Sequence, residues 1–174
     1  MKFNFTNLDE QTRALMKEEI ARAADNDEIY FSARFNDIGS SNWVSWLTEA
    51  ADSHDEHWLA YQIEASGGMK DFEGRAKPTG GYTVAHVPHT AAETMADGQF
   101  NRFCIAAVCR RAIEAGQNDV TIYRARHRGE PRPESIALEG TTTNARTLLE
   151  QVRGKQTSFG CALLKPNSGL SVQL

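Results

Sequence analysis

Apolar residues are densest between residues 99 and 115, where they cover most of the circumference of an expected helix. They are Phe100, Phe103, Cys104, Ile105, Ala107, Val108, Ala112 and Ile113. A helix that is apolar on more than one side is buried on more than one side. Asp97 is the expected N-cap and Gly116 the expected stop signal. We therefore predict that this segment is the central helix of the core.

Shorter helices are predicted before and after this segment. Apolar residues recur at helical spacing after Asn7, around Trp43 and after Ser53. Ser53 and Glu56 have the spacing of a capping box, which predicts the start of the third of these helices. A last helix is predicted over Asn144–Arg153.

Strand patterns occupy four other segments. Glu28–Phe35 alternates apolar and polar residues as a half-buried strand does, and Tyr82–Val87, Val120–Tyr123 and Leu170–Leu174 are shorter candidates. Met69–Gly81 is rich in glycine and charge, which predicts a surface loop. The pattern as a whole predicts an α+β fold in which a small mixed or antiparallel sheet packs on the central helix.

Residues 1–174 fit one globular domain, since a chain of this length buries enough surface to form a core of its own. Its net charge of −4 disfavours a protein that coats nucleic acid. No apolar run approaches the roughly 18 residues of a membrane span, so we expect no membrane contact and a cytoplasmic protein, or one in a particle assembled in the cytoplasm.

An extended arm is predicted at about residues 124–135, because Pro131 and Pro133 oppose helix formation there. Its arginines are Arg124, Arg126, Arg128 and Arg132. Arginine suits both phosphate and carboxylate groups. Three interpretations stay open: solvated charges at a strand end, direct contact with nucleic acid, or contact with a protein partner.

We expect the arm and the tail to bind a neighbouring chain together. The arginines would meet carboxylates at the rim of the contact. The tail residues Leu170, Val172 and Leu174 would fill an apolar groove or complete a sheet of the partner.

No catalytic residue, metal or cofactor is predicted. His54 with His57 and His86 with His89 form two short pairs, and each would need a further ligand to hold zinc. The three cysteines, Cys104, Cys109 and Cys161, have no activating partner in the sequence and are expected to be buried structural thiols. The glycines form no phosphate-binding motif.

Several motifs are similar to one known family. They are Phe100-Asn-Arg-Phe103, Cys109-Arg-Arg-Ala-Ile-Glu-Ala-Gly116, Val120-Thr-Ile-Tyr123-Arg-Ala-Arg126, Pro131-Arg-Pro-Glu-Ser135 and Pro166-Asn-Ser-Gly-Leu-Ser-Val-Gln-Leu174. Over most of its length the chain resembles an uncharacterised family of tailed-bacteriophage and prophage proteins. Members commonly have tyrosine where this chain has Cys104. The family has no established catalytic residues to transfer.

The resemblance implies a phage protein with a structural role. The expected function is a non-catalytic virion protein that decorates or joins capsid or connector subunits. Its partners would be copies of itself and other virion subunits. Two alternatives remain: a phage-encoded inhibitor that binds a host defence component, and a small metal-dependent enzyme that uses the histidine pairs.

Overall fold

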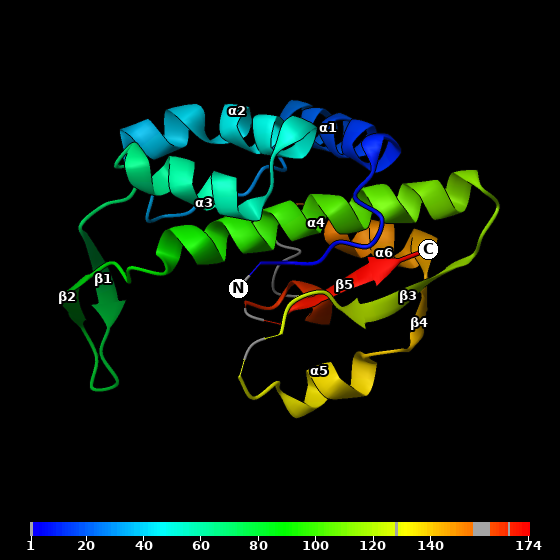
Figure 1. Cartoon of the computed structure of the whole chain (residues 1–174). Coiled ribbons are helices and arrows are strands. Elements are labelled where there is room, and N and C mark those ends of the chain that lie inside the picture. Colours follow the sequence, from blue (N-terminus) through cyan, green and yellow to red (C-terminus); the bar gives the residue numbers. More distant parts are fainter. Residues whose placement is uncertain (1, 128, 155–160, 167) are drawn as a thin grey trace.

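Helix α4 (Ala91–Glu114) runs through the middle of the computed structural model (Figure 1), which describes residues 2–127, 129–154, 161–166 and 168–174. Its buried residues lie on all sides, as the sequence predicts for residues 99–115. The helix begins earlier than predicted and passes through Asp97 and Gly98 without a break. The burial of Met95 and Ala96 offsets the helix cost of Gly98, which is about 0.5–1 kcal/mol relative to alanine.

The fold class is α+β, as predicted. In chain order, the other elements are α1 (Glu10–Asp25), α2 (Asp37–Ser53), α3 (Glu56–Ala65), β1 (Phe72–Ala76), β2 (Tyr82–His86), β3 (Asp119–Arg124), α5 (Pro133–Leu138), β4 (Thr142–Asn144), α6 (Ala145–Val152), a single 3-10 turn (Ala162–Leu164) and β5 (Leu170–Gln173). Helices α1, α2 and α3 cover one side of α4, and the sheet formed by β3, β4 and β5 lies on the other side with α6 (Figure 1).

Side-chain caps begin the helices of this layer. Asp9 caps α1, Asn36 caps α2 and Asp55 caps α3, each by accepting a hydrogen bond from a backbone N–H in the first turn. The predicted capping box at Ser53 is therefore wrong, since Ser53 is the last residue of α2. The carboxylate of Asp55 is the better cap because it also complements the positive end of the α3 dipole.

Residues 28–35 are all described by the structure, and they do not form the strand predicted over Glu28–Phe35. Phe35 makes one isolated bridge with Met69, and the rest of the segment crosses between helices. The Tyr30 carbonyl accepts a hydrogen bond from the Trp43 indole N–H (3.1 Å) instead of from a neighbouring strand. An alternating pattern forms a strand only where a partner strand lies beside it, and here the neighbours are helices.

The three-stranded sheet is antiparallel, with β3 in the centre and β4 and β5 at its edges. Ile122 of β3 lies opposite Val172 of β5, and both side chains are buried. The predicted strands over Val120–Tyr123 and the C-terminal segment are thus confirmed. A second sheet, formed by β1 and β2, is a separate hairpin.

Candidate interaction surface

Two of the four arm arginines, Arg124 and Arg126, pair within their own domain, so these two do not support the expectation that the arm meets a neighbouring chain. Arg126 has only 3% of its side chain exposed and forms ion pairs with Glu93 and Asp97 of α4. Its guanidinium also lies over the Phe3 ring, 5.5 Å from the centroid. A charge buried and paired in this way is not available to a partner.

The other arm arginines divide between burial and exposure. Arg124 has 6% of its side chain exposed, and its Nε donates a hydrogen bond to Glu139 (2.8 Å). Arg132 is exposed, and Arg128 lies outside the described residues. The arm is also shorter than predicted, because Pro133 begins α5 instead of extending the chain. Proline fits this first helical position, where its missing N–H is no loss.

The tail is part of the core, so it does not fill a groove of another chain. Leu170 and Val172 are buried in β5, and the Arg126 N–H donates to the Gly169 carbonyl (3.0 Å). Gly169 has a φ of +68°, and a Cβ at this position would lie 2.3 Å from the Arg126 carbonyl oxygen, so the close approach requires glycine. Leu174 is 41% exposed and is the only one of the three predicted tail residues still open to a partner.

The histidine pairs lie apart. His54 stacks on Trp58 with ring centroids 4.3 Å apart, while His86 packs against Phe72 at 4.4 Å. In the part of the chain that the structure describes, no three histidine, cysteine or acidic side chains form a group that could hold a metal ion. The metal-dependent enzyme alternative required the two histidine pairs to meet at one site, and the described residues do not form such a site.

The thiols are buried, as the sequence predicts. Burial raises the pKa of Cys104 and of Cys109 to about 12, and it also raises the pKa of Cys161. The three thiols are therefore protonated at neutral pH. Since the thiolate is the nucleophile, none of them is poised for covalent chemistry.

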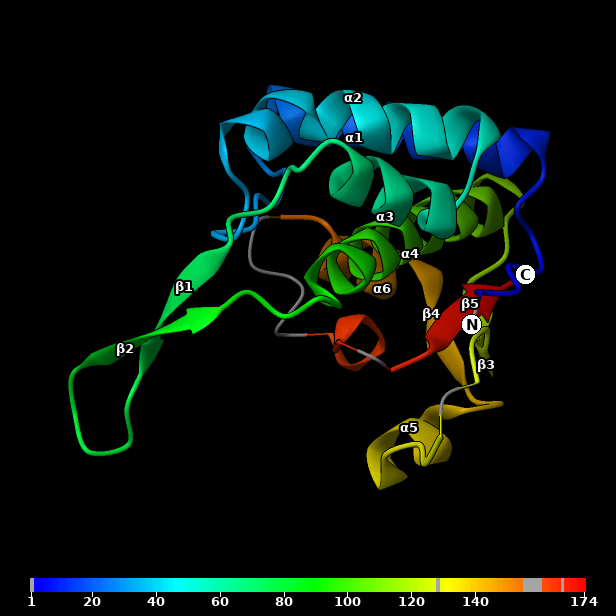
Figure 2. The same cartoon turned by 60° about the vertical axis from the view of Figure 1, so that its left-hand side comes forward.

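A hairpin made by β1 and β2 projects from the body of the molecule (Figures 1 and 2). The two strands pair only with each other among the described strands. Gly80 and Gly81 have positive φ values of 88° and 79° in the turn, and the Lys77 N–H donates to the Gly81 carbonyl (2.9 Å). A two-stranded hairpin is marginally stable alone in water, so an outside contact would stabilise it.

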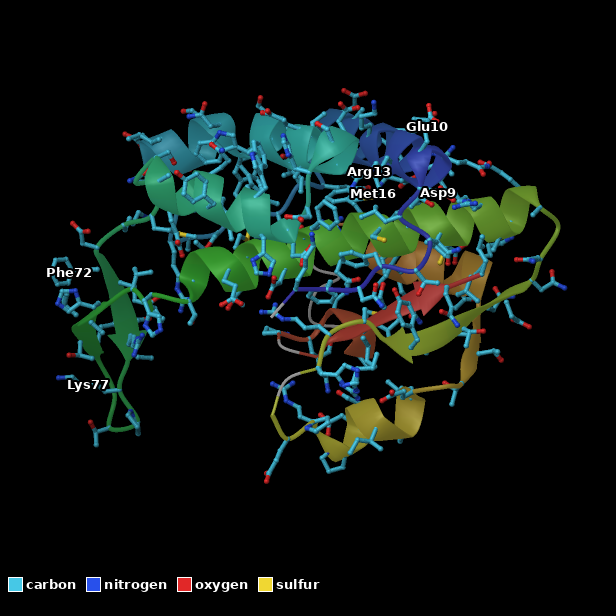
Figure 3. The ribbon with its side chains drawn as sticks, viewed as in Figure 1. Asp9, Glu10, Arg13, Met16, Phe72 and Lys77 are labelled. Atoms are coloured by element: carbon cyan, nitrogen blue, oxygen red, sulfur yellow. The ribbon has the colours of Figure 1, made fainter. Side chains whose placement is uncertain are left out.

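The two faces of the hairpin differ in chemistry. The register places Phe72 opposite His86, Gly74 opposite Val84 and Ala76 opposite Tyr82, which puts these six residues on one face. All six are exposed, and the three large apolar ones are Phe72 by 52%, Tyr82 by 79% and Val84 by 75%. Figure 3 shows Phe72 and Lys77 pointing away from the body of the molecule. The outward face of the hairpin is therefore apolar.

The opposite face attaches the hairpin to the body. Arg34 donates two hydrogen bonds to Glu73, through Nε (2.5 Å) and Nη2 (3.2 Å), and Arg75 donates a third. Hydrogen bonds from Arg34 and then from Arg75 lower the pKa of Glu73, so the anchor is ionised at neutral pH. The Lys70 N–H also donates to the Arg34 carbonyl (2.8 Å). These contacts hold the hairpin with its apolar face turned outward.

The sequence prediction missed this surface because it assigned β1 to a loop. The signal present in the sequence is the alternation of Phe72, Gly74 and Ala76 with Glu73 and Arg75, next to the predicted strand at Tyr82. The glycines of this segment, Gly74, Gly80 and Gly81, favoured a loop and hid this alternation. In the structure Gly74 leaves space beside Tyr82, whose ring lies 4.0 Å from where a Cβ would be.

None of the described helices has both the length and the apolar character that a membrane span requires. Comparisons with protein-family models, curated proteins and solved structures gave no significant match to this chain. The phage resemblance therefore stays a prediction, and the outward face of the hairpin is the feature on which a function can be argued.

Proposed function

We propose that this chain is a non-catalytic structural subunit of a bacteriophage particle that contacts neighbouring subunits through the outward face of the β1–β2 hairpin. Two supports carry the proposal. The sequence motifs resemble phage proteins, and the hairpin presents Phe72, Tyr82 and Val84 to solvent. The arm and the tail, which the sequence suggested as the contact, give little support because Arg126, Leu170 and Val172 are buried in their own domain.

The exposed hairpin face has the size of a functional patch. The exposed fractions of Phe72, Tyr82 and Val84 correspond to an apolar area on the order of 400 Å². The largest apolar patch on a monomeric protein is usually of this size and is often a binding site. A partner that covered it would also supply the second packing layer that an isolated hairpin lacks.

A single contact of this size is weak, which suits a subunit present in many copies. At about 25 cal/mol per Å², burial of about 400 Å² contributes roughly 10 kcal/mol before costs. Association itself costs about 4–15 kcal/mol, so little net affinity remains for one contact. In a particle the contact is repeated on a fixed lattice, and each further contact benefits from a high effective concentration.

The experiment that tests this function measures incorporation into particles. A phage that carries the gene is grown, its particles are banded on a density gradient, and the chain is quantified against the major capsid protein by mass spectrometry. We expect the wild-type chain to band with the particles at a fixed ratio. The double variant Tyr82→Ser/Val84→Ser should stay in the soluble fraction, because it loses the apolar face.

The matched control is Ile136→Ser on α5, which removes another exposed apolar side chain far from the hairpin in sequence. This variant should band with the particles as the wild type does. A wild-type chain that stays soluble would overturn the proposal. If that soluble chain then forms a one-to-one complex with a host protein, the inhibitor alternative takes its place.

A further inference from the structure

The outer surface of α2 and α3 is complementary to the hairpin in charge. Residues 37–66 contain six acidic side chains and no lysine or arginine. They are Asp37, Glu49, Asp52, Asp55, Glu56 and Glu64. Asp52 and Asp55 pair with lysines, and Glu56 is buried. Asp37 and Glu64 are exposed and form no ion pair with any described residue.

Apolar side chains accompany these two carboxylates. Ile38 and Tyr61 are exposed, and Tyr61 lies on the same face of α3 as Glu64 because the two are three residues apart. The start of α2 and the end of α3 lie side by side, since the Asn36 side chain donates to the Gly67 carbonyl (2.6 Å). We call Asp37, Ile38, Tyr61 and Glu64 the acidic patch. It combines exposed apolar surface with negative charge.

The hairpin carries the opposite charge. Residues 72–86 hold Arg75 and Lys77 against one acidic residue, Glu73, which pairs with Arg75, so the hairpin has a net charge of +1. Lys77 forms no ion pair with any residue in the described ranges and extends away from the body (Figure 3). The hairpin thus presents exposed apolar side chains and, next to its turn, a lysine with no ion pair among the described residues. These are the features that the acidic patch would recognise.

The hairpin leaves Asp37, Ile38 and Tyr61 of its own chain exposed, while Glu64 lines a hollow with Lys70 and His86 at the base of the hairpin. The hairpin leaves the body at the end of α3 and runs away from α2 and α3 in both views (Figures 1 and 2). The pairing of Arg34 with Glu73 holds it in that direction. A second copy of the chain would bring a hairpin to the patch from outside.

We propose that two copies of this chain form a two-fold dimer in which the hairpin of each copy docks on the acidic patch of the other. This inference rests on the proposed function and names its first partner, a second copy. One hairpin face offers on the order of 400 Å² of apolar area, which is below the roughly 800 Å² per partner of a stable interface. In a reciprocal pair each copy both gives a hairpin and receives one, so the area per copy about doubles.

The experiment is sedimentation equilibrium of the purified full chain at concentrations around 100 µM and below, at low and at physiological salt. We expect a mass of two chains and a Kd that rises with salt, because salt screens the charge pairs. Lys77→Glu should raise the Kd about tenfold, and so should the variant Asp37→Lys/Glu64→Lys. Both changes together in one chain should bring the Kd back to within about threefold of the wild type.

Two further variants separate docking from folding. Tyr82→Ser should weaken the dimer at least about tenfold through lost apolar contact, while Ile136→Ser should leave the Kd unchanged. Circular dichroism of each variant should match the wild type, since Tyr82 and Ile136 are exposed.

Three results would overturn the dimer. They are a wild-type mass of one chain at about 100 µM, a charge reversal with no effect on the Kd, and a combined reversal that fails to restore it. None of them refutes the particle function. If the hairpin variant is lost from particles while the purified wild type is monomeric, the hairpin docks on a different subunit.

Discussion

Glu19 of α1 joins three parts of the fold, and its loss should destabilise the protein. Its side chain is 2% exposed and accepts hydrogen bonds from Arg153 Nη2 (2.7 Å) and Nε (3.0 Å), and from Arg22 Nε (3.1 Å). Arg110 of α4 lies 3.4 Å from it. The change Glu19→Gln keeps the shape and removes the charge, which leaves arginines without their shared carboxylate.

The expected loss follows from how much water the arginines can reach. Breaking a buried ion pair costs about 3–5 kcal/mol. Here the side chains of Arg22, Arg110 and Arg153 are 28%, 23% and 35% exposed. Water can therefore solvate the three guanidinium groups and offset part of the lost ion-pair energy. We expect Glu19→Gln to lower the free energy of unfolding by about 2–3 kcal/mol.

Urea denaturation followed by tryptophan fluorescence measures this change. With a slope of about 1–3 kcal/mol per M, a loss of about 2–3 kcal/mol should lower the midpoint by roughly 0.7–3 M. The control is Glu18→Gln, because Glu18 is 61% exposed and pairs with Arg110 at 2.8 Å. An exposed pair of this kind contributes less than about 1 kcal/mol. Equal midpoint shifts for the two variants would refute the reasoning.

The pH dependence gives an independent check. Burial opposes ionisation of Glu19, but hydrogen bonds and charges from Arg153 and Arg22 outweigh it and lower the pKa of this carboxyl. A group with a lowered pKa stabilises the fold above its unfolded pKa, and this contribution is lost as pH falls. The difference between wild type and Glu19→Gln should therefore be largest at neutral pH and shrink below about pH 4.3.

Three further predictions concern the core, the central helix and the start of α3. Leu170→Ala should cost about 2–5 kcal/mol in a thermal melt because Leu170 is fully buried, whereas Leu174→Ala should have little effect; equal losses would contradict the burial of the tail. Gly98→Ala should stabilise the protein by up to about 1 kcal/mol, since no atom lies within 4 Å of the added Cβ, and a lower midpoint in urea would contradict this. Burial raises the pKa of Glu56, so its ionisation destabilises the fold as pH rises above about 4.3. In urea titrations, Glu56→Gln should therefore gain stability relative to the wild type between pH 4 and pH 7. A stability difference between the two proteins that is the same at both pH values would be evidence against a raised pKa.

Local signals in the sequence determined most of the helices. The all-round apolar pattern of residues 99–115 identified the buried helix, because a helix with no polar face has no stable position at the surface. The short apolar strands at Val120 and Leu170 were also identified, because a strand pattern reports burial of one face. These features depend on neighbours a few residues away in the chain.

The tertiary structure decided what each charged or exposed segment contacts. Arg126 is buried because Glu93 and Asp97, about thirty residues earlier, project from α4 to meet it, and no local pattern shows that pairing. The same holds for Glu28–Phe35, where helices stand in place of a partner strand.

The outward face of the hairpin is also a tertiary property. Phe72, Tyr82 and Val84 have the sequence character of core residues, and only the register of β1 with β2 and the pairing of Glu73 with Arg34 turn them to solvent. Sequence fixes which side chains share a face, because that follows from the period of a strand. Whether that face meets the core or the solvent depends on contacts between residues far apart in the chain.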